Sequence, residues 1–262
     1  MSEIVQHCFG APHAGGPATA LERLLEASGQ TYPVVWQRAA AGGLSLPLLW
    51  RMTREIRRHR PRLVHVRGLG NEGFHAALAA RLAGVPQVLV SVHGTHRDLV
   101  VGRRSLRRWI VVKLLEPATL RLASAVATVC HTAAARPFLA PYRAKLVAPV
   151  PNGVTIPTLP DERRRAVRRN LGIEDDRLVA IAVSRLTVEK GYGDLASALS
   201  GLESRGHILD LIVVGGGVET AAIQALFKGL RSIRVHFVGP QQDVGRFLAA
   251  ADLYVSPSWN EN

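Results

Sequence analysis

The 262-residue sequence predicts an α/β protein made of two Rossmann-like, doubly wound domains in tandem. Short apolar runs alternate with helix-length segments, which is typical of parallel sheets covered by helices on both faces. A proline- and glycine-rich break, residues 149–157, interrupts this alternation once. Aromatic residues make up 5% of the chain, and this low content favours helices on parallel strands over an all-β sandwich.

The first domain is predicted to span residues 1–157. Its helix over residues 72–83 ends before Gly84 and Pro86, and its helix over 105–122 is expected to kink at Pro117. Two further helices are predicted over residues 18–27 and 46–59. The predicted strands are residues 3–9, 32–37, 63–66, 87–92, 124–129 and 145–148.

The second domain is predicted to span residues 158–262, with helices over 161–172, 191–204, 219–228 and 244–250. Its predicted strands are residues 178–183, 208–214, 234–238 and 252–256. A strand that ends a parallel unit normally leads into a returning helix, and none follows here. We therefore expect the second domain to be incomplete and the chain to be C-terminally truncated.

Charge divides the chain at the same break. Residues 1–157 contain 20 Lys/Arg and 7 Asp/Glu, a net charge of +13, whereas residues 158–262 contain 13 of each. Such asymmetry indicates two units with different partners, and a basic unit favours an anionic one. Arginines cluster at positions 51, 54, 57 and 58 and again at 103, 104, 107 and 108, where Trp109 follows. This arrangement predicts contact with an anionic membrane surface, while no recognition motif supports nucleic-acid binding.

The N-terminal segment MSEIVQHCF has the charged Glu3 and no long apolar region, so a signal peptide is not expected. The most apolar stretch, residues 109–130, contains four residues that disfavour a membrane span: Lys113, Glu116, Pro117 and Arg121. Two cysteines provide no disulfide framework. These features predict a cytoplasmic protein, peripheral at the inner face of the plasma membrane.

Loops after strands carry the candidate ligand residues, because ligands of doubly wound sheets bind at the carboxyl ends of the strands. Gly15 and Gly16 precede the first helix, where the backbone either approaches a phosphate or sugar closely or forms a tight turn before the helix. The dinucleotide motif G-x-G-x-x-G is not matched, which disfavours a nicotinamide cofactor. His93 follows the fourth strand, and no set of carboxylates or cysteines completes a metal site with it.

In the second domain, Arg185 and Lys190 lie five positions apart in a loop between a strand and a helix. Both side chains could bind one diphosphate, the arginine through its planar guanidinium and the lysine as a point charge. Gly215 and Gly239 end the next two strands, where each glycine allows close approach of a ligand or forms a simple turn. Glu261 places a carboxylate after the last strand.

Taken together, these segments resemble the retaining, nucleotide-sugar-dependent glycosyltransferases of the GT-B fold, in the family numbered four. The resemblance covers nearly the whole chain and is most specific from Ala182 to Asn262. It rests on the segments AGGPATALERLLEA, SVHGTH, VPNGVTIP, AVSRLTVEKGYGDLASAL, LIVVGGG and VHFVGPQQDVGRFLAAADLYVSPSWNEN.

The resemblance implies that the first domain binds the acceptor and the second binds the nucleotide sugar. Arg185 and Lys190 would hold the diphosphate and stabilise the leaving nucleotide without a metal, and His93 would lie over the donor sugar. Gly16 would contact the donor phosphates or the acceptor. Donor-binding positions are thus expected at Gly15, Gly16, Gly215 and Gly239. Glu261 would be the first carboxylate of the family's pair E-x7-E, whose second member would fall beyond Asn262.

The expected function is transfer of a sugar, with retention, from a nucleotide-sugar donor to a lipid- or glycan-linked acceptor. The expected setting is cell-envelope polysaccharide or lipopolysaccharide synthesis, and no cofactor or metal is expected. Because the second carboxylate of the pair is not in the sequence, a non-catalytic remnant or binding module stays open as an alternative. A nucleotide-sugar epimerase of the same fold fits the Arg185, Lys190 and Glu261 pattern less well.

Overall fold

A computed structural model describes residues 3–11, 15–38, 43–95, 97, 105–153 and 160–259. The chain divides into two compact units, Met1–Val154 and Thr155–Glu261, here named unit 1 and unit 2. The domain boundary predicted after Pro157 lies within residues 154–159, outside the described residues.

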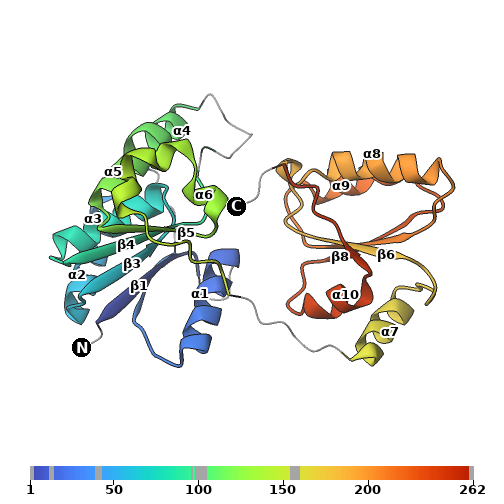
Figure 1. Cartoon of the computed structure of the whole chain (residues 1–262), viewed down its shortest axis with the longest axis horizontal. Coiled ribbons are helices and arrows are strands. Elements are labelled where there is room, and N and C mark those ends of the chain that lie inside the picture. Colours follow the sequence, from blue (N-terminus) through green and yellow to red (C-terminus); the bar gives the residue numbers. More distant parts are fainter. Residues whose placement is uncertain are drawn as a thin grey trace. The chain divides into compact units, whose positions relative to one another are not determined.

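Unit 1 contains a five-stranded parallel sheet in the order β2-β1-β3-β4-β5. Figure 1 shows α1 on one face of this sheet and α2, α3 and α5 on the other. The strands are β1 Ile4–Phe9, β2 Val34–Gln37, β3 Leu63–Arg67, β4 Gln87–Val92 and β5 Ala125–Thr128. The longer helices are α1 Gly15–Ser28, α2 Leu46–His59, α3 Asn71–Leu82 and α5 Glu116–Leu122.

The side chains of β3 and β4 alternate between the two faces, as expected for strands. Val64, Val66, Val88 and Val90 belong to the large core under α2, α3 and α5. The intervening residues of β3, including His65 and Arg67, therefore lie on the face that α1 covers. Helix α2 shows why this packing forms, since its buried residues follow helical spacing: Leu49, Met52, Thr53 and Ile56.

One prediction for unit 1 is confirmed with a change and another is wrong. The helix expected over residues 105–122 runs without a break from 106 to 122, as α4 Leu106–Ile110, the π turn η1 Val111–Leu115, and α5. The strand expected over 145–148 is reduced to one bridge between Val126 and Leu146. It is preceded by α6 His131–Ala134 and the 3-10 segment η2 Pro137–Lys145. The Lys145 ammonium donates to the carbonyls of residues 120, 121 and 123, which fixes the end of η2 against the end of α5.

Unit 2 contains a four-stranded parallel sheet in the order β8-β7-β6-β9. Its strands are β6 Val179–Val183, β7 Asp210–Val214, β8 Arg234–Gly239 and β9 Leu253–Tyr254. Helices α8 Tyr192–Glu203 and α9 Thr220–Leu226 cover one face, and α7 Asp161–Asn170 and α10 Gly245–Ala250 cover the other (Figure 1). The short turn η3 Val188–Lys190 precedes α8. The predicted α/β class with parallel, Rossmann-like sheets is confirmed.

Charged groups at the amino ends of the unit 2 strands are paired with one another. Buried Asp210 accepts hydrogen bonds from Arg177, Arg234 and His236 at 2.6–2.9 Å. Burial by itself raises the pKa of Asp210, but these donors outweigh it and the pKa is lowered. Arg168, also buried, donates to Asp252 at 2.8 Å. These ion pairs hold the strand ends together at the amino edge of the sheet, opposite the carboxyl edge.

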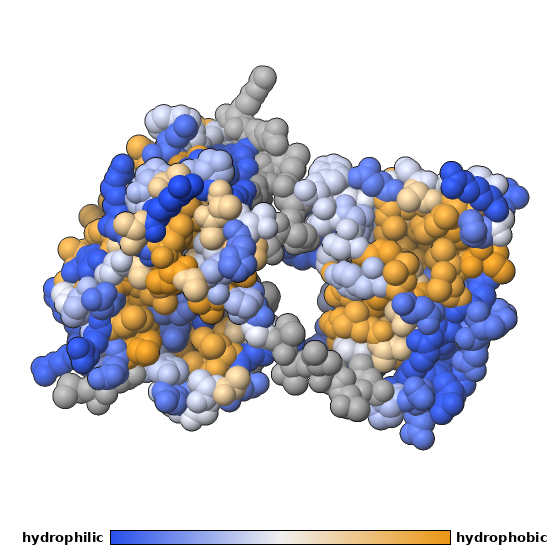
Figure 2. Space-filling model, in the orientation of Figure 1, coloured by the Kyte–Doolittle hydropathy of each residue, from blue (hydrophilic) through white to orange (hydrophobic). Residues whose placement is uncertain are grey.

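The edge strand β9 pairs with β6 over two residues, Leu253 and Tyr254, and both side chains are about half exposed. Figure 2 shows apolar side chains gathered on the visible face of unit 2. No helix within the described ranges is long and apolar enough to cross a bilayer.

Candidate functional site

The loop after β6 forms one wall of a pocket at the carboxyl edge of the unit 2 sheet. The N–H of Ser184 donates to the carbonyl of Val214 at 3.1 Å, and the N–H of Leu186 donates to that of Gly216, also at 3.1 Å. These bonds continue the β6–β7 pairing beyond the strands. The loop backbone is therefore held by the neighbouring strand rather than left to vary.

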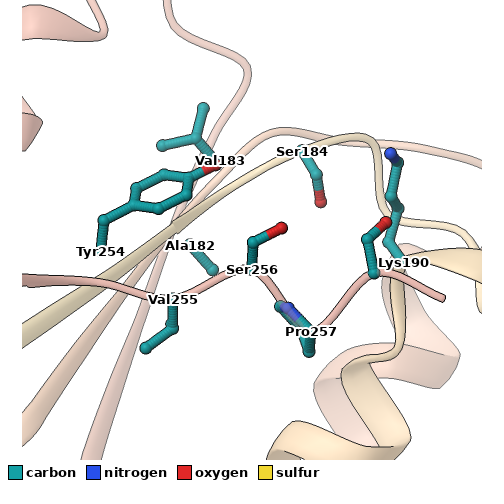
Figure 3. A pocket seen from close by; sticks show the side chains of 9 residues that line it. Ala182, Val183, Ser184, Lys190, Tyr254, Val255, Ser256 and Pro257 are labelled. Atoms are coloured by element: carbon teal, nitrogen blue, oxygen red, sulfur yellow. The ribbon is translucent and has the colours of Figure 1, made fainter. Parts of the chain in front are cut away.

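Residues after β9 form the opposite wall. The segment Val255–Ser258 lines the pocket together with Ser184 and Lys190. Figure 3 shows the hydroxyl groups of Ser184 and Ser256 and the side chain of Lys190 around the same space. Trp259 anchors this wall, since its N–H donates to the Glu189 carbonyl at 3.0 Å and its indole N–H to Asp194 at 2.6 Å.

Two glycines allow close approaches of the backbone around the pocket. Gly191 has a φ of +69°, and a Cβ there would lie 2.0 Å from the carbonyl oxygen of Pro257. A Cβ on Gly215 would lie 1.9 Å from the carbonyl oxygen of Ser184. Gly215 is therefore required for chain packing beside the pocket, whatever it contacts in a complex. Gly239 ends β8, and its carbonyl accepts from the N–H of Gly215 at 3.0 Å.

The pocket supplies hydroxyl groups and one ammonium group. The hydroxyl of Ser184 lies 2.8 Å from that of Tyr192, and burial raises the pKa of Tyr192, which keeps the phenol protonated at neutral pH. Hydroxyl and cationic donors of this kind bind oxygen-rich anions such as phosphates in proteins. The donor types are therefore those that the predicted diphosphate site requires.

Of the two predicted diphosphate ligands, Lys190 lines this pocket and Arg185 is not among the described residues that line it. The Arg185 side chain is 74% exposed, and its guanidinium lies 3.8 Å from the Glu189 carboxylate. The role of Arg185 therefore stays a prediction. Glu261 lies outside the described residues.

His93 lies in a second pocket, in unit 1, at the carboxyl ends of β3, β4 and β5. His65 and Arg67 line the same pocket. Burial lowers the pKa of His93 to about 4, with a further contribution from the Arg67 charge, so His93 is neutral at pH 7. Gly15 and Gly16 open helix α1, and residues 12–14 before them lie outside the described residues.

Sequence reasoning missed Arg67, which ends β3, because the predicted strand stopped at Val66. The signal was present in the alternation of Val64, His65, Val66 and Arg67, with polar residues at every second position. It also missed the hydroxyl groups of Tyr192 and Ser256 in unit 2.

Two doubly wound parallel units in one chain, each with a pocket at its carboxyl edge, define the GT-B class of fold. Two family models match the chain, one described as Glycosyltransferase Family 4 over residues 7–156 and one as Glycosyl transferases group 1 over residues 177–262. The chain therefore belongs to this family of glycosyltransferases, and the resemblance predicted from the sequence is confirmed.

Relatives and solved structures agree with this assignment. The "putative teichuronic acid biosynthesis glycosyltransferase TuaC" of Bacillus subtilis is 32% identical over 104 residues, which are 38% of this chain and 24% of that protein. The chain spans less than a third of the curated relatives it matches.

The crystal structure of WaaG, a glycosyltransferase involved in lipopolysaccharide biosynthesis, superposes with a TM-score of 0.70 and 19% identity. That match covers 98% of this chain and 75% of WaaG. The catalytic domain of starch synthase IV from Arabidopsis thaliana, bound to ADP and acarbose, has a TM-score of 0.65 at 13% identity. It covers 100% of this chain and 79% of that one.

Proposed function

We propose that this chain transfers a glycosyl group, with retention, from a nucleotide-diphosphate sugar to a lipid- or glycan-linked acceptor in cell-envelope polysaccharide or lipopolysaccharide synthesis. The pocket of unit 2 carries the proposal, because it places Lys190 and three serines, Ser184, Ser256 and Ser258, at the carboxyl edge of a doubly wound sheet. Membership of the glycosyltransferase family supports the reaction class.

The proposed roles follow from the charge that develops during transfer. As the sugar–phosphate bond breaks, negative charge accumulates on the leaving diphosphate, and a fixed cation beside it lowers the barrier. Lys190 supplies this cation, with Arg185 as its partner from the same loop. The resemblance to the family supports roles for Glu261 and His93 at the donor sugar, and for Gly15, Gly16, Gly215 and Gly239 in the backbone that binds the donor.

The nature of the substrates is supported by similar proteins. Starch synthase IV holds ADP in its structure, which favours a nucleotide donor. TuaC and WaaG are named for teichuronic acid and lipopolysaccharide synthesis, which favours a cell-envelope acceptor. A polymer of that kind is assembled at the membrane, so we place this protein in the cytoplasm at the inner face of the plasma membrane, bound through the basic unit 1.

The test is a binding and turnover screen of the 262-residue chain with UDP-, ADP- and GDP-sugars. Replacing Lys190 by Ala should weaken nucleotide-diphosphate binding at least about tenfold, the scale for a lost charge-assisted hydrogen bond. Lys228→Ala, an exposed lysine elsewhere in unit 2, is the matched control and should bind as the wild type does.

Product analysis by NMR reports whether the anomeric configuration is retained. Equal affinity of the wild type and Lys190→Ala would contradict the donor site. Tight binding without turnover would favour the non-catalytic binding module, and epimerised nucleotide sugar would favour the epimerase.

A further inference from the structure

The pocket in unit 1, here named the Arg67 pocket, contains a buried charge that the fold does not use. It lies on the α1 face of the sheet, is partly open to solvent, and has a cavity volume of about 70 Å³. Arg67 and His65 of β3, Ser91 and His93 at the end of β4, and Asn152 contribute its polar groups. No acidic residue is among the described residues that line it.

Arg67 is 6% exposed, and its Nε–H has no hydrogen-bond acceptor among the described residues. No carboxylate of the residues that the structure describes lies within ion-pair distance of the Arg67 guanidinium. The neighbouring Cys8 thiol provides no counter-charge, because burial raises its pKa and keeps it protonated. A guanidinium buried without a carboxylate is destabilising, since the lost hydration is not replaced.

The other titratable groups of the pocket are neutral. Burial lowers the pKa of His65 to about 3 and that of His93 to about 4, and the Arg67 charge adds to both shifts. His65 and Ser91 lie 2.5 Å apart through Nε2 and Oγ. Arg67 is therefore the single cation among the described lining residues, surrounded by neutral groups that can donate hydrogen bonds.

We infer that the Arg67 pocket binds one oxyanion, a carboxylate or phosphate group carried by a sugar substrate. The planar guanidinium matches both groups in bidentate geometry, and burial of Arg67 strengthens the attraction because little water competes for its charge. Binding would replace the missing counter-charge, which explains how a buried arginine is retained at this position. Oxyanion binding is independent of the proposed function, whereas its assignment to a substrate rests on that function.

The first experiment titrates the full chain with inorganic phosphate and with acetate at constant ionic strength, using calorimetry. Arg67→Gln should weaken the affinity for the bound anion at least about 30-fold, the scale for losing one partner of a buried charge pair. Arg62→Gln, at the other end of the same strand and highly exposed, should change it less than about twofold. Equal affinity in the wild type and Arg67→Gln, or no binding of either anion, would overturn the inference.

A second variant excludes misfolding as the cause. Arg67→Met removes the buried charge and keeps a long, unbranched side chain. The melting temperature of this variant without anion should therefore equal or exceed that of the wild type. Anion should raise the melting temperature of the wild type and not that of Arg67→Met. A folded Arg67→Met protein that still responds to anion would contradict the inference.

Two further titrations identify the source of the oxyanion. If the donor sugar carries it, UDP-glucuronate should bind more tightly than UDP-glucose, and Arg67→Gln should remove the difference. If the acceptor carries the oxyanion, a sugar phosphate should bind to the wild type and lose affinity in Arg67→Gln. Its affinity should be the same with and without nucleotide. Loss of nucleotide binding in Lys190→Ala with unchanged phosphate binding would separate anion binding in the Arg67 pocket from nucleotide binding in the Lys190 pocket. Conversely, a chain that binds phosphate through Arg67 but no nucleotide sugar would refute only the proposed function.

Discussion

Lowering the pH from 7.5 to 5 is expected to destabilise unit 1 through three buried histidines. Burial lowers the pKa of His7 and of His93 to about 4 and that of His65 to about 3, from an ordinary value of 6.5. The Arg67 charge lowers the pKa of all three further, whereas the neighbouring Gln37 opposes the shift of His7. Below pH 6.5 the unfolded chain therefore binds protons that the folded unit does not.

The sign follows from this difference in proton binding. The stability contributed by each histidine is complete above its unfolded pKa of 6.5 and is lost as the pH falls toward the folded value. At pH 5, protonation of each histidine in the unfolded state lowers the free energy of unfolding by about 2 kcal/mol. Independent titration of the three would remove about 6 kcal/mol, which is comparable with the whole stability of an ordinary domain.

Urea unfolding at pH 7.5 and pH 5, followed by tryptophan fluorescence, measures this loss. Three of the four tryptophans, at positions 36, 50 and 109, belong to unit 1, so the signal reports mainly on that unit. His65→Gln, which can still hydrogen-bond to Ser91, should reduce the loss by about 2 kcal/mol. His131→Asn, at an exposed position, is the control and should leave it unchanged. An unfolding free energy independent of pH, or an equal loss in His65→Gln, would refute the reasoning.

Two further predictions concern unit 2. Gly191→Ala should destabilise the unit by about 2–4 kcal/mol in chemical denaturation, because a Cβ would meet the Pro257 carbonyl and φ is positive. Gly193→Ala, where a Cβ meets nothing within 4 Å inside α8, should instead be neutral or stabilising. Hydrogen bonds from the backbone N–H of Arg231 and from the hydroxyl and N–H of Ser232 lower the pKa of Glu203 to about 2. The wild type should therefore have a higher melting temperature than Glu203→Gln at neutral pH. This difference in melting temperature should vanish as the pH falls from 4.5 toward 2.

The fold could be predicted because the two periodicities in the chain are distinct. Continuous apolar strands such as Leu211–Val214 and helices with spaced apolar residues such as α2 each follow from burial on one or both faces. The order of the strands in each sheet could not be predicted, because neighbouring strands are distant in the sequence and are brought together only by packing in the folded unit. Residues 137–148 were also misread as ending in a strand, because contacts of Lys145 with α5 fix that segment as a 3-10 turn.

Part of each candidate site could be predicted from the position of its residues after predicted strands. Lys190 and His93 follow strands, and the rule that ligands bind at the carboxyl ends of strands places both beside pockets. The sequence led to no prediction for Arg67, because the predicted strand stopped at Val66. The burial of Arg67 depends on α1 and on residues 128–129 and 150–153, which are distant in the chain and meet only in the folded unit.

The surface of unit 1 supports the predicted contact with an anionic membrane. Arg51, Arg54 and Arg58 are exposed on α2, where Arg54 lies 5.4 Å from the ring centroid of Trp50, a side chain that is 65% exposed. On α4, Leu106 is 72% exposed and Trp109 54%. Of the second predicted cluster, Arg107 and Arg108 are described, and Arg103 and Arg104 lie outside the described residues. Exposed aromatic and arginine side chains on a helix are typical of segments that bind at a membrane interface.

Vesicle co-sedimentation tests this membrane contact. Each arginine near an anionic leaflet is worth about 1 kcal/mol, so replacing Arg51, Arg54 and Arg58 by Gln should weaken binding about 100-fold. The matched control replaces three exposed arginines of α7 in unit 2, Arg163, Arg165 and Arg169, by Gln and removes the same charge. Because the attraction acts within a Debye length, binding should fall steeply with salt and should require anionic lipid. If net charge alone governed adsorption, both triple variants would lose binding equally, and that result, or equal binding to neutral vesicles, would contradict a specific membrane face on unit 1.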